Sequence, residues 1–233
     1  MTTRSYGQFC GVARAMEMVG ERWSMLIVRD LLVGHRRFTD LRRGLPGIPS
    51  NILTTRLREM EDAGVLQRRA LPRPDAGVVY ELTEYGRELE GVVLLLGRWG
   101  AQSLASVREG EIVTTDSMVM ALRSTFQSNT ARGLTASYEL RTGPVTIHAR
   151  IDNGVLTVMS GSLAGVDLII EAFGPLKPLL SGEISAGAAV SAGHLRIDGP
   201  MERLIQFADV FRIANTFRKI EAVGPRPRPS PAS

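Results

Sequence analysis

Residues 48–64 read Ile-Pro-Ser-Asn-Ile-Leu-Thr-Thr-Arg-Leu-Arg-Glu-Met-Glu-Asp-Ala-Gly, and this stretch decides the fold of the first half of the chain. Leu53, Leu57 and Met60 recur at the spacing of one helix face and form an apolar stripe. The opposite face carries small polar residues and then a cation, at Asn51, Thr54, Thr55 and Arg58. Such side chains reach base edges and phosphates when a helix lies in the major groove. The stretch therefore predicts a helix that packs on one side and reads DNA on the other.

Three helices are predicted before this one. The spacing of apolar residues marks residues 9–19 and 22–33 as helical, and the second segment is apolar on nearly all sides. A helix of that kind is typically central in a core. Residues 38–45 read as a third helix that Gly44 ends, and a turn at 46–49 leads into the DNA-reading helix, which Gly64 ends.

After Gly64 the periodicity becomes that of strands. Residues 65–70 and 77–82 read as two strands, and the loop 71–76 between them is rich in turn formers. A helix, a turn, a second helix and a β-hairpin make up a winged helix-turn-helix arrangement, whose second helix enters the major groove. Arg68, Arg69 and Arg73 on the wing would then face phosphates or a minor groove.

Basic residues gather in this half of the chain. Residues 22–73 hold eleven arginines and five acids, a local net charge of +6, whereas the chain from residue 110 onward is close to neutral. The clustering favours a polyanionic partner for the first half alone. The predicted DNA-binding residues are Ser50, Asn51, Thr54, Thr55, Arg58, Arg36, Arg37, Arg68, Arg69 and Arg73.

Two of these arginines, and Arg56 outside the set, leave alternatives open. Arg36 and Arg37, at a helix junction, are phosphate contacts or solvated surface charges. Arg56 falls on the flank of the apolar stripe, beside Ile52, so an internal ion pair is favoured over a phosphate contact there.

Motifs in this half closely resemble those of the HxlR-type winged-helix transcriptional regulators, over about residues 8–104. The residues that carry the resemblance are Cys10, residues 19–32 (VGERWSMLIVRDLL), 37–41 (RFTDL), 53–61 (LTTRLREME) and 80–89 (YELTEYGREL). Gly11 departs from the pattern, because the family commonly has proline after the cysteine. The resemblance implies a homodimer through the first and last helices of the domain, with two DNA half-sites about one helical turn apart. The apolar positions of residues 89–99 agree with it.

The second half predicts a different α+β unit. Helices are expected at 115–127, 176–180, 185–192 and 201–213, and strands at 136–141, 145–151, 155–159, 167–171 and 195–197. The Asn153-Gly154 pair between two alternating runs is a strong hairpin signal. Residues 165–170, 179–185, 192–199 and 204–208 resemble the sterol carrier protein type-2 fold over about residues 112–220.

That fold implies an apolar tunnel for a lipid-like molecule. The candidate lining residues are Met118, Leu122, Phe126, Ile147, Leu156, Val158, Phe173, Leu176, Leu180, Phe207 and Phe211. The alternative for each of them is an ordinary core position, and a missing tunnel would remove the ligand hypothesis.

The fold class is accordingly α+β, with a winged helix-turn-helix domain followed by a sterol-carrier-like domain that has a mostly antiparallel sheet. The expected domains are 1–106 and 112–220, and the Pro-rich residues 221–233 should be a disordered tail. No apolar run is long enough to span a membrane, and the N-terminus lacks the apolar core of a signal peptide. We therefore expect a soluble, cytoplasmic protein.

The sequence offers little for catalysis or for metal binding. Cys10 is the only cysteine, and His35, His148 and His194 lie singly on unrelated elements. We expect no enzyme activity, cofactor or metal, and we expect double-stranded DNA, a second copy of the chain and an apolar effector as partners. Two alternatives remain open: a thiol switch at Cys10, which is a redox candidate at a helix start, and a lipid carrier that retains a DNA-binding module.

Overall fold

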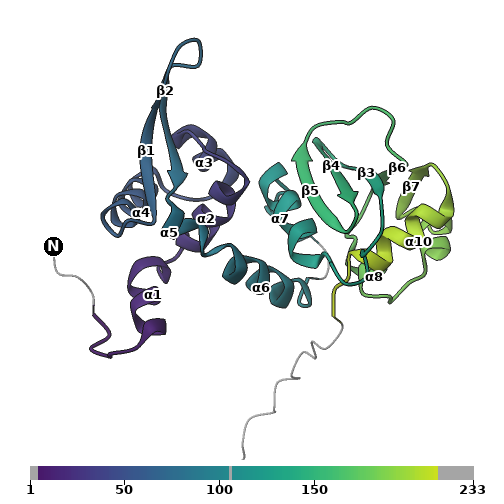
Figure 1. Ribbon diagram of the computed structural model, residues 1–233, viewed down its shortest axis with the longest axis horizontal. Coiled ribbons are helices and arrows are strands. Elements are labelled where there is room, and N and C mark those ends of the chain that lie inside the picture. The colour runs from purple at the N-terminus through teal and green to yellow at the C-terminus, as the bar shows by residue number, and fades with distance from the viewer. Residues whose placement is uncertain (1–4, 105–106, 215–233) are drawn as a thin grey trace, which may run out of the picture.

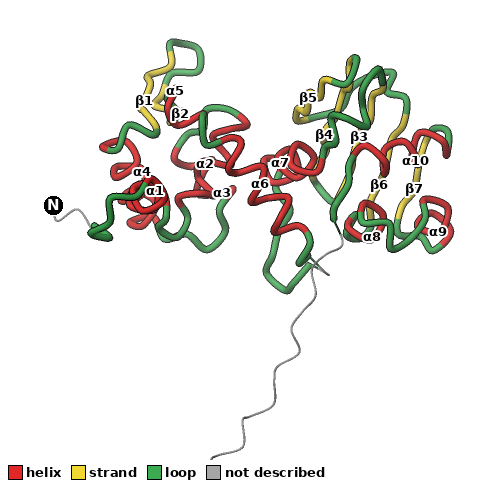
Figure 2. Tube along the Cα trace, turned by 60° about the horizontal axis from the view of Figure 1, so that its bottom comes forward, coloured by secondary structure: helices red, strands yellow, loops and turns green. Residues whose placement is uncertain are grey.

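The computed structural model describes residues 5–104 and 107–214, which form two bodies side by side (Figure 1). A narrow β-hairpin projects from the N-terminal body, and a curved sheet with helices against it makes the C-terminal one (Figures 1 and 2). The predicted tail at 221–233 lies outside the described residues.

The N-terminal body has the predicted winged helix-turn-helix order. Its elements are α1 (Gly11–Val19), α2 (Ser24–Val33), α3 (Phe38–Gly44), α4 (Ser50–Asp62), β1 (Leu66–Leu71), β2 (Gly77–Leu82), α5 (Glu84–Arg87) and α6 (Glu90–Ala101). Strands β1 and β2 pair antiparallel and form the wing. Helix α4 and strands β1 and β2 begin and end within three residues of the bounds predicted from the sequence.

The apolar stripe of α4 anchors that helix to the core, as its spacing predicts. Leu53, Leu57 and Met60 are 0%, 2% and 0% exposed, and they pack with the buried Ile27 and Val28 of α2. Each fully buried side chain of this kind contributes about 1.5–3 kcal/mol relative to an exposed one. Packing therefore fixes which side of α4 faces outward.

The C-terminal body is a five-stranded sheet with helices. Its elements are α7 (Thr115–Thr125), β3 (Ala136–Thr142), β4 (Val145–Asp152), β5 (Val155–Ser160), β6 (Leu168–Ala172), α8 (Lys177–Leu180), α9 (Ala186–Ser191), β7 (Leu195–Asp198) and α10 (Met201–Val210). The strand order is β5-β4-β3-β6-β7, and only the β3–β6 pair is parallel. This confirms the α+β class and the mostly antiparallel sheet, while the sterol-carrier likeness stays a prediction.

Aromatic residues in the core of the C-terminal body pack directly on one another. The ring centroids of Phe207 and Phe211 are 4.7 Å apart, and Tyr138 lies 5.2 Å from Phe207. These distances are those of direct ring contact. The predicted lining residues that are buried in this core are Leu122, Ile147, Leu180, Phe207 and Phe211, and those packed against it are Met118, Phe126, Leu156, Val158 and Leu176. All ten therefore belong to the core of this body, and their lining of a tunnel stays a prediction.

Phe173 corrects the predicted lining more directly. Its side chain is 58% exposed, and the guanidinium of Arg196 lies 5.5 Å from its ring centroid. The ring thus lies on the surface, directly after the last residue of β6.

Helix α7 belongs to both bodies, although the sequence assigns it to the second one alone. Met120 is buried in the N-terminal core, whereas Val119 and Leu122 are buried in the C-terminal core. Arg98 of α6 also donates through Nε to the carbonyl of Ser124, at 2.9 Å. The packing therefore joins the two bodies through this helix.

Candidate nucleic-acid interface

The predicted reading face of α4 is open to solvent. Ser50, Asn51, Thr54, Thr55 and Arg58 are all exposed, on the side opposite the buried stripe. The hydroxyls of Thr54 and Thr55 donate to the carbonyls four residues earlier, both at 2.9 Å, which orients each side chain along the helix. This face thus has the polar groups and the access that base contacts need.

Arg58 is the most available cation on this face. Its Nε lies 4.0 Å from an Asp62 carboxylate oxygen, and both side chains are largely exposed. Exposed pairs of this kind contribute about 0–1 kcal/mol, so a phosphate or a base edge can replace Asp62 at little cost. Arg56 differs, because its side chain is 15% exposed and pairs with Glu59 and, at 3.5 Å, with Glu21. The internal ion pair favoured for Arg56 is confirmed.

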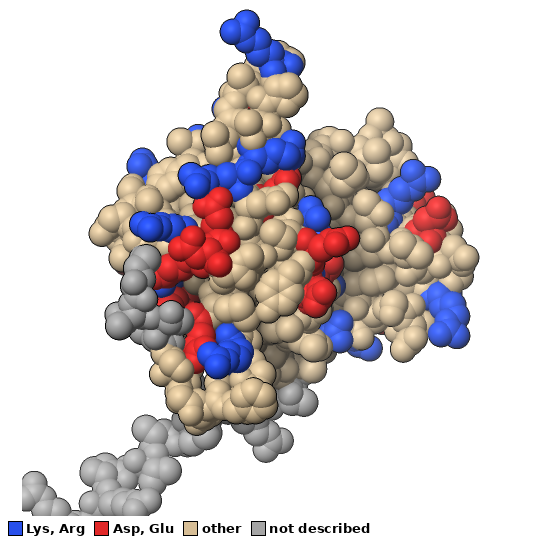
Figure 3. Space-filling view, turned by 60° about the vertical axis from the view of Figure 1, so that its left-hand side comes forward, with Lys and Arg blue, Asp and Glu red and all other residues tan. Residues whose placement is uncertain are grey.

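The wing presents exposed arginines that pair with partly buried acidic side chains. Arg68 Nε donates to Glu61 at 3.0 Å and Arg69 Nε donates to Glu81 at 2.9 Å. The hydrogen bond with Glu61 raises the pKa of the Arg68 guanidinium above its usual value. Arg73 is exposed in the loop at the end of the hairpin, where Figure 3 shows a basic side chain above the acidic ones on the same face of the molecule.

Arg36 corrects the predicted phosphate contacts. Its backbone N–H and C=O pair with those of Tyr80 on the wing, at 3.0 and 2.8 Å. Its side chain donates through Nε and Nη2 to both carboxylate oxygens of Asp116 on α7, at 2.8 and 2.6 Å. The hydrogen bonds to Asp116 raise the pKa of Arg36. The ion pair is mostly buried and links the two bodies. The Arg36 guanidinium is therefore not free to bind a phosphate.

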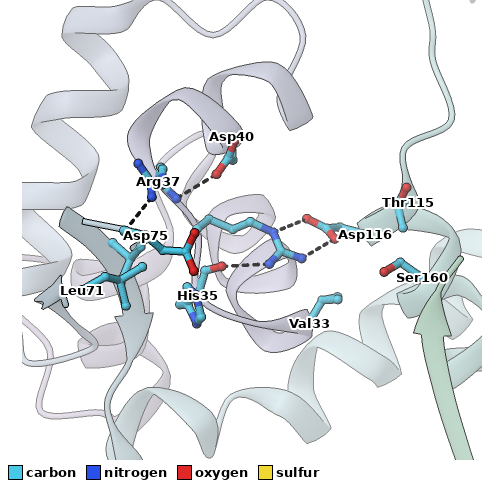
Figure 4. Close-up of a pocket in the computed structure, with 11 residues that line it drawn as sticks. Val33, His35, Arg37, Asp40, Leu71, Asp75, Thr115, Asp116 and Ser160 are labelled. Atoms are coloured by element: carbon cyan, nitrogen blue, oxygen red, sulfur yellow. Dashed lines mark hydrogen bonds and ion pairs between the residues drawn. The ribbon is translucent and has the colours of Figure 1, made fainter. Parts of the chain in front are cut away.

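Arg37 is also engaged inside the protein. Its Nη2 donates to the main-chain oxygen of Asp75 in the wing loop, at 2.8 Å, and its N–H donates to Asp40 Oδ2 at 3.2 Å (Figure 4). The first bond ties the wing loop to the start of α3, and the second caps that helix. Arg36 is therefore no longer expected to contact DNA, whereas the charge of Arg37 has no carboxylate partner among the described residues and its phosphate contact stays a prediction.

Two other arginines were missed. Arg42 and Arg43 lie in the last turn of α3 and are exposed, and Arg42 Nη1 is 3.2 Å from the hydroxyl of Ser50 at the start of α4. The first helix of a helix-turn-helix pair crosses the DNA backbone, which suits cations there. They belong to the same arginine cluster as Arg36 and Arg37, but the sequence could not show which of its members are already paired.

Helices α1 and α6 leave large apolar side chains uncovered. Trp99 is 74% exposed and Leu95 is 65% exposed. The same holds for other residues in and next to these two helices, namely Tyr6, Phe9, Val12, Met16, Val92, Leu96 and Leu104. Apolar patches of this extent mark interaction surfaces in proteins.

Cys10 precedes the first turn of α1 and is exposed. Hydrogen bonds from the backbone N–H groups of Ala13 and Val12 lower the pKa of its thiol. A lowered pKa increases the thiolate fraction, which is the reactive form. Among the described residues, no group of three or more His, Cys, Asp or Glu side chains is arranged to hold a metal ion. Nor does any helix in this part of the chain have the length and apolarity to cross a membrane.

Comparisons with known proteins place this interface in a family. Residues 18–108 match the family model described as HxlR-like helix-turn-helix. The HTH-type transcriptional regulator YtcD of Bacillus subtilis is 38% identical over 96 residues, which cover 41% of this chain and 76% of YtcD. The regulator YybR of the same organism is 34% identical over 107 residues, which cover 45% of this chain and 86% of YybR.

Among solved structures, the redox regulator HypR in its reduced form is similar at 34% identity and a TM-score of 0.37, covering 39% of this chain and 90% of HypR. Each of these matches covers less than half of this chain. Through its winged helix-turn-helix half, the chain belongs to the HxlR-like helix-turn-helix family.

Proposed function

We propose that this protein is a transcriptional regulator that binds double-stranded DNA through α4 and the wing. The observation that carries the proposal is the pair of opposite faces on α4. Leu53, Leu57 and Met60 fix the helix to the core, so Asn51 and Arg58 are presented outward on a rigid element. Arg42, Arg43 and Arg73 supply the flanking cations for the DNA backbone.

The regulator acts as a homodimer in this proposal. The exposed apolar side chains of α1 and α6 lie on the body that carries the DNA-reading helix, and a second copy of the chain would cover them. A two-fold dimer then presents two copies of α4, one to each half-site. Two readers on one rigid dimer raise the affinity for paired half-sites over that for a single one.

DNA binding is tested with fragments that the wild-type protein selects from a randomised pool. Fluorescence anisotropy should show at least a tenfold loss of affinity for Asn51→Ala/Arg58→Ala, because each base contact contributes about 1–3 kcal/mol. Arg150→Ala is the matched control, since Arg150 is exposed on β4 of the other body. Equal affinity of the double variant and the wild type would reject the proposal.

The proposal also includes control of DNA binding by the C-terminal body. Helix α7 supports it, because Met120 is buried on the DNA-binding side and Leu122 on the other, so a change in one core displaces a helix that the other core holds. An apolar effector of the kind predicted from the sequence would have to enter between packed rings. DNA affinity is measured before and after solvent extraction of the purified protein, and identical values reject an apolar effector.

Cys10 supports a second candidate, redox control of DNA binding. The thiol is exposed, its pKa is lowered, and it adjoins α1, which carries part of the uncovered apolar surface. Oxidation there would alter the dimer contact and thus the spacing of the two α4 helices. Oxidant should change the DNA affinity of the wild type and leave that of Cys10→Ser unchanged. The same response in both proteins would exclude Cys10.

A lipid carrier with a DNA-binding module is the remaining alternative. The variant Asn51→Ala/Arg58→Ala also separates it from the regulator. Loss of DNA binding with unchanged uptake of a fluorescent fatty acid favours the regulator with a separate ligand-binding body.

A further inference from the structure

A cleft of about 570 Å³ opens where the wing, the start of α3 and the C-terminal body meet (Figure 4). The wing contributes Leu71, Asp75 and Val79 to its lining, and α7 and β5 contribute Thr115, Asp116 and Ser160. The rest comes from the end of α2, the segment after it and α3, namely Val33, His35, Arg36, Arg37 and Asp40. Small-molecule sites in proteins have volumes of this order and often lie between domains.

Most of the charge around the cleft is already paired. Arg36 and Asp116 neutralise each other in a two-point ion pair. Asp40 accepts the N–H of Arg37 and lies 3.7 Å from Arg43. These groups form the frame of the cleft and have little capacity left for a ligand.

One charge of each sign remains uncommitted. Within the described part of the chain, no carboxylate lies within ion-pair distance of the Arg37 guanidinium, which bonds only the main-chain oxygen of Asp75. Equally, no hydrogen bond or ion pair engages the Asp75 carboxylate among these residues. The hydroxyls of Thr115 and Ser160 and the exposed ring of His35 add further polar groups, whereas Val33, Leu71 and Val79 make an apolar wall.

We propose that this cleft binds a small dipolar molecule of the α-amino-acid class. The ligand carboxylate would meet the guanidinium of Arg37, whose planar donors suit a carboxylate. Its ammonium group would meet the Asp75 carboxylate, and a short apolar side chain would lie against Val79 and Leu71. A ligand with a single charge would leave one of the two protein groups unmatched in a partly enclosed site, which costs affinity.

The site has a direct mechanical connection to DNA binding. Arg36 holds the wing through its backbone bonds to Tyr80 and holds α7 through Asp116, and Arg37 holds the wing loop. A ligand between these groups changes the angle of the wing relative to α4. This consequence rests on the proposed function as a DNA-binding regulator, whereas occupancy of the cleft does not.

Isothermal titration calorimetry on the full chain, without DNA, tests the site. L-leucine is the probe, and 3-methylbutylamine and 4-methylpentanoate are its analogues that lack the carboxylate or the ammonium group. We expect L-leucine to bind at least about tenfold more tightly than either analogue. No detectable binding of L-leucine at about 10 mM, or equal affinity for the three compounds, would overturn the proposal.

Variants locate the ligand. Arg37→Gln and Asp75→Asn should each weaken L-leucine binding at least about tenfold, while Arg150→Gln, exposed on β4 and outside the cleft lining, should not. Circular dichroism checks that each variant is folded. If Arg37→Gln does not fold, the affinities of the wild type for the three compounds test the proposal. Unchanged affinity in both folded variants rejects the site. Because no DNA is present in this titration, its result does not depend on whether the protein binds DNA.

Discussion

The two bodies of this protein differ in where their large aromatic and aliphatic side chains lie. The N-terminal body leaves Leu95 and Trp99 exposed on α6, whereas the C-terminal body encloses Tyr138, Phe207 and Phe211 in direct ring contact. In the proposed dimer a second copy would cover the first surface, whereas the rings of the second core are already covered within one chain. The difference favours self-association through the N-terminal body, as in the proposed dimer.

Buried acids show a second contrast. Glu139 in the C-terminal body is buried, but its two carboxylate oxygens accept hydrogen bonds from Arg141 and from the N–H of Leu163, at 2.7 and 3.0 Å. Asp30 on α2 is 1% exposed, and its Oδ2 has no hydrogen-bond partner among the described residues. Its other oxygen, Oδ1, pairs with Arg29 at 2.7 Å. The N-terminal body therefore contains a buried group whose contribution to stability depends on protonation.

The largest expected effect concerns the enclosed core. Phe207→Ala should lower the free energy of unfolding by about 3–5 kcal/mol, because it removes a fully buried ring and leaves a cavity. Ile205→Ala on the same helix is the matched control, since Ile205 is half exposed, and it should change stability by less than about 0.5 kcal/mol. Urea denaturation measures both values. An equally small change in the free energy of unfolding for both variants would contradict the full burial of Phe207.

The exposed face of α6 comes next. Leu95→Glu/Trp99→Glu should weaken self-association at least about 100-fold, equivalent to about 2.7 kcal/mol, because charged groups would be buried in the dimer. Analytical ultracentrifugation over a concentration series measures the dissociation constant. Val155→Glu on the exposed edge strand β5 is the control and should leave it unchanged. If the wild type stays monomeric at all concentrations, the proposed dimer through α1 and α6 is wrong.

Asp30 should make the free energy of unfolding depend on pH. Burial, as the main cause, raises the pKa of Asp30 from 3.8 to about 6. Between these two pH values the folded chain holds a proton that the unfolded chain has released, so this group stabilises the fold at low pH and the contribution is lost as the pH rises through 6. Relative to Asp30→Asn, the wild type should therefore lose about 2–3 kcal/mol between pH 4 and pH 7.5. Denaturant titrations of both proteins at the two pH values measure this, and a pH-independent difference contradicts it.

The smallest effect concerns the junction between the bodies. Arg36→Gln should lower the free energy of unfolding by about 1–2 kcal/mol and speed hydrogen exchange at the Tyr80 amide, because the mostly buried pair with Asp116 is lost. Arg108→Gln is the control, since its pair with Glu111 is 3.8 Å long and exposed, and it should have almost no effect. Unchanged exchange at Tyr80 would mean that Arg36 does not hold the wing.

The elements and the reading face of α4 could be predicted from the sequence, because they follow from local periodicity. Leu53, Leu57 and Met60 repeat at helical spacing, and Asn153-Gly154 adopt positive φ angles of 49° and 83° in the hairpin that this pair predicts. The roles of Arg36 and Arg37 could not be predicted. Their partners, Asp116 and the carbonyl of Asp75, are 80 and 38 residues away along the chain.

The sequence by itself therefore determined the order of helices and strands, the winged helix-turn-helix unit and the outward polar face of α4, since each depends on residues within a few turns of one another. Tertiary structure alone decided that α7 is shared by both bodies, that the aromatic rings of the C-terminal body close on each other, and that Arg36 holds the wing. Those outcomes depend on long-range contacts, and a side chain's charge or apolarity does not specify which distant partner it meets.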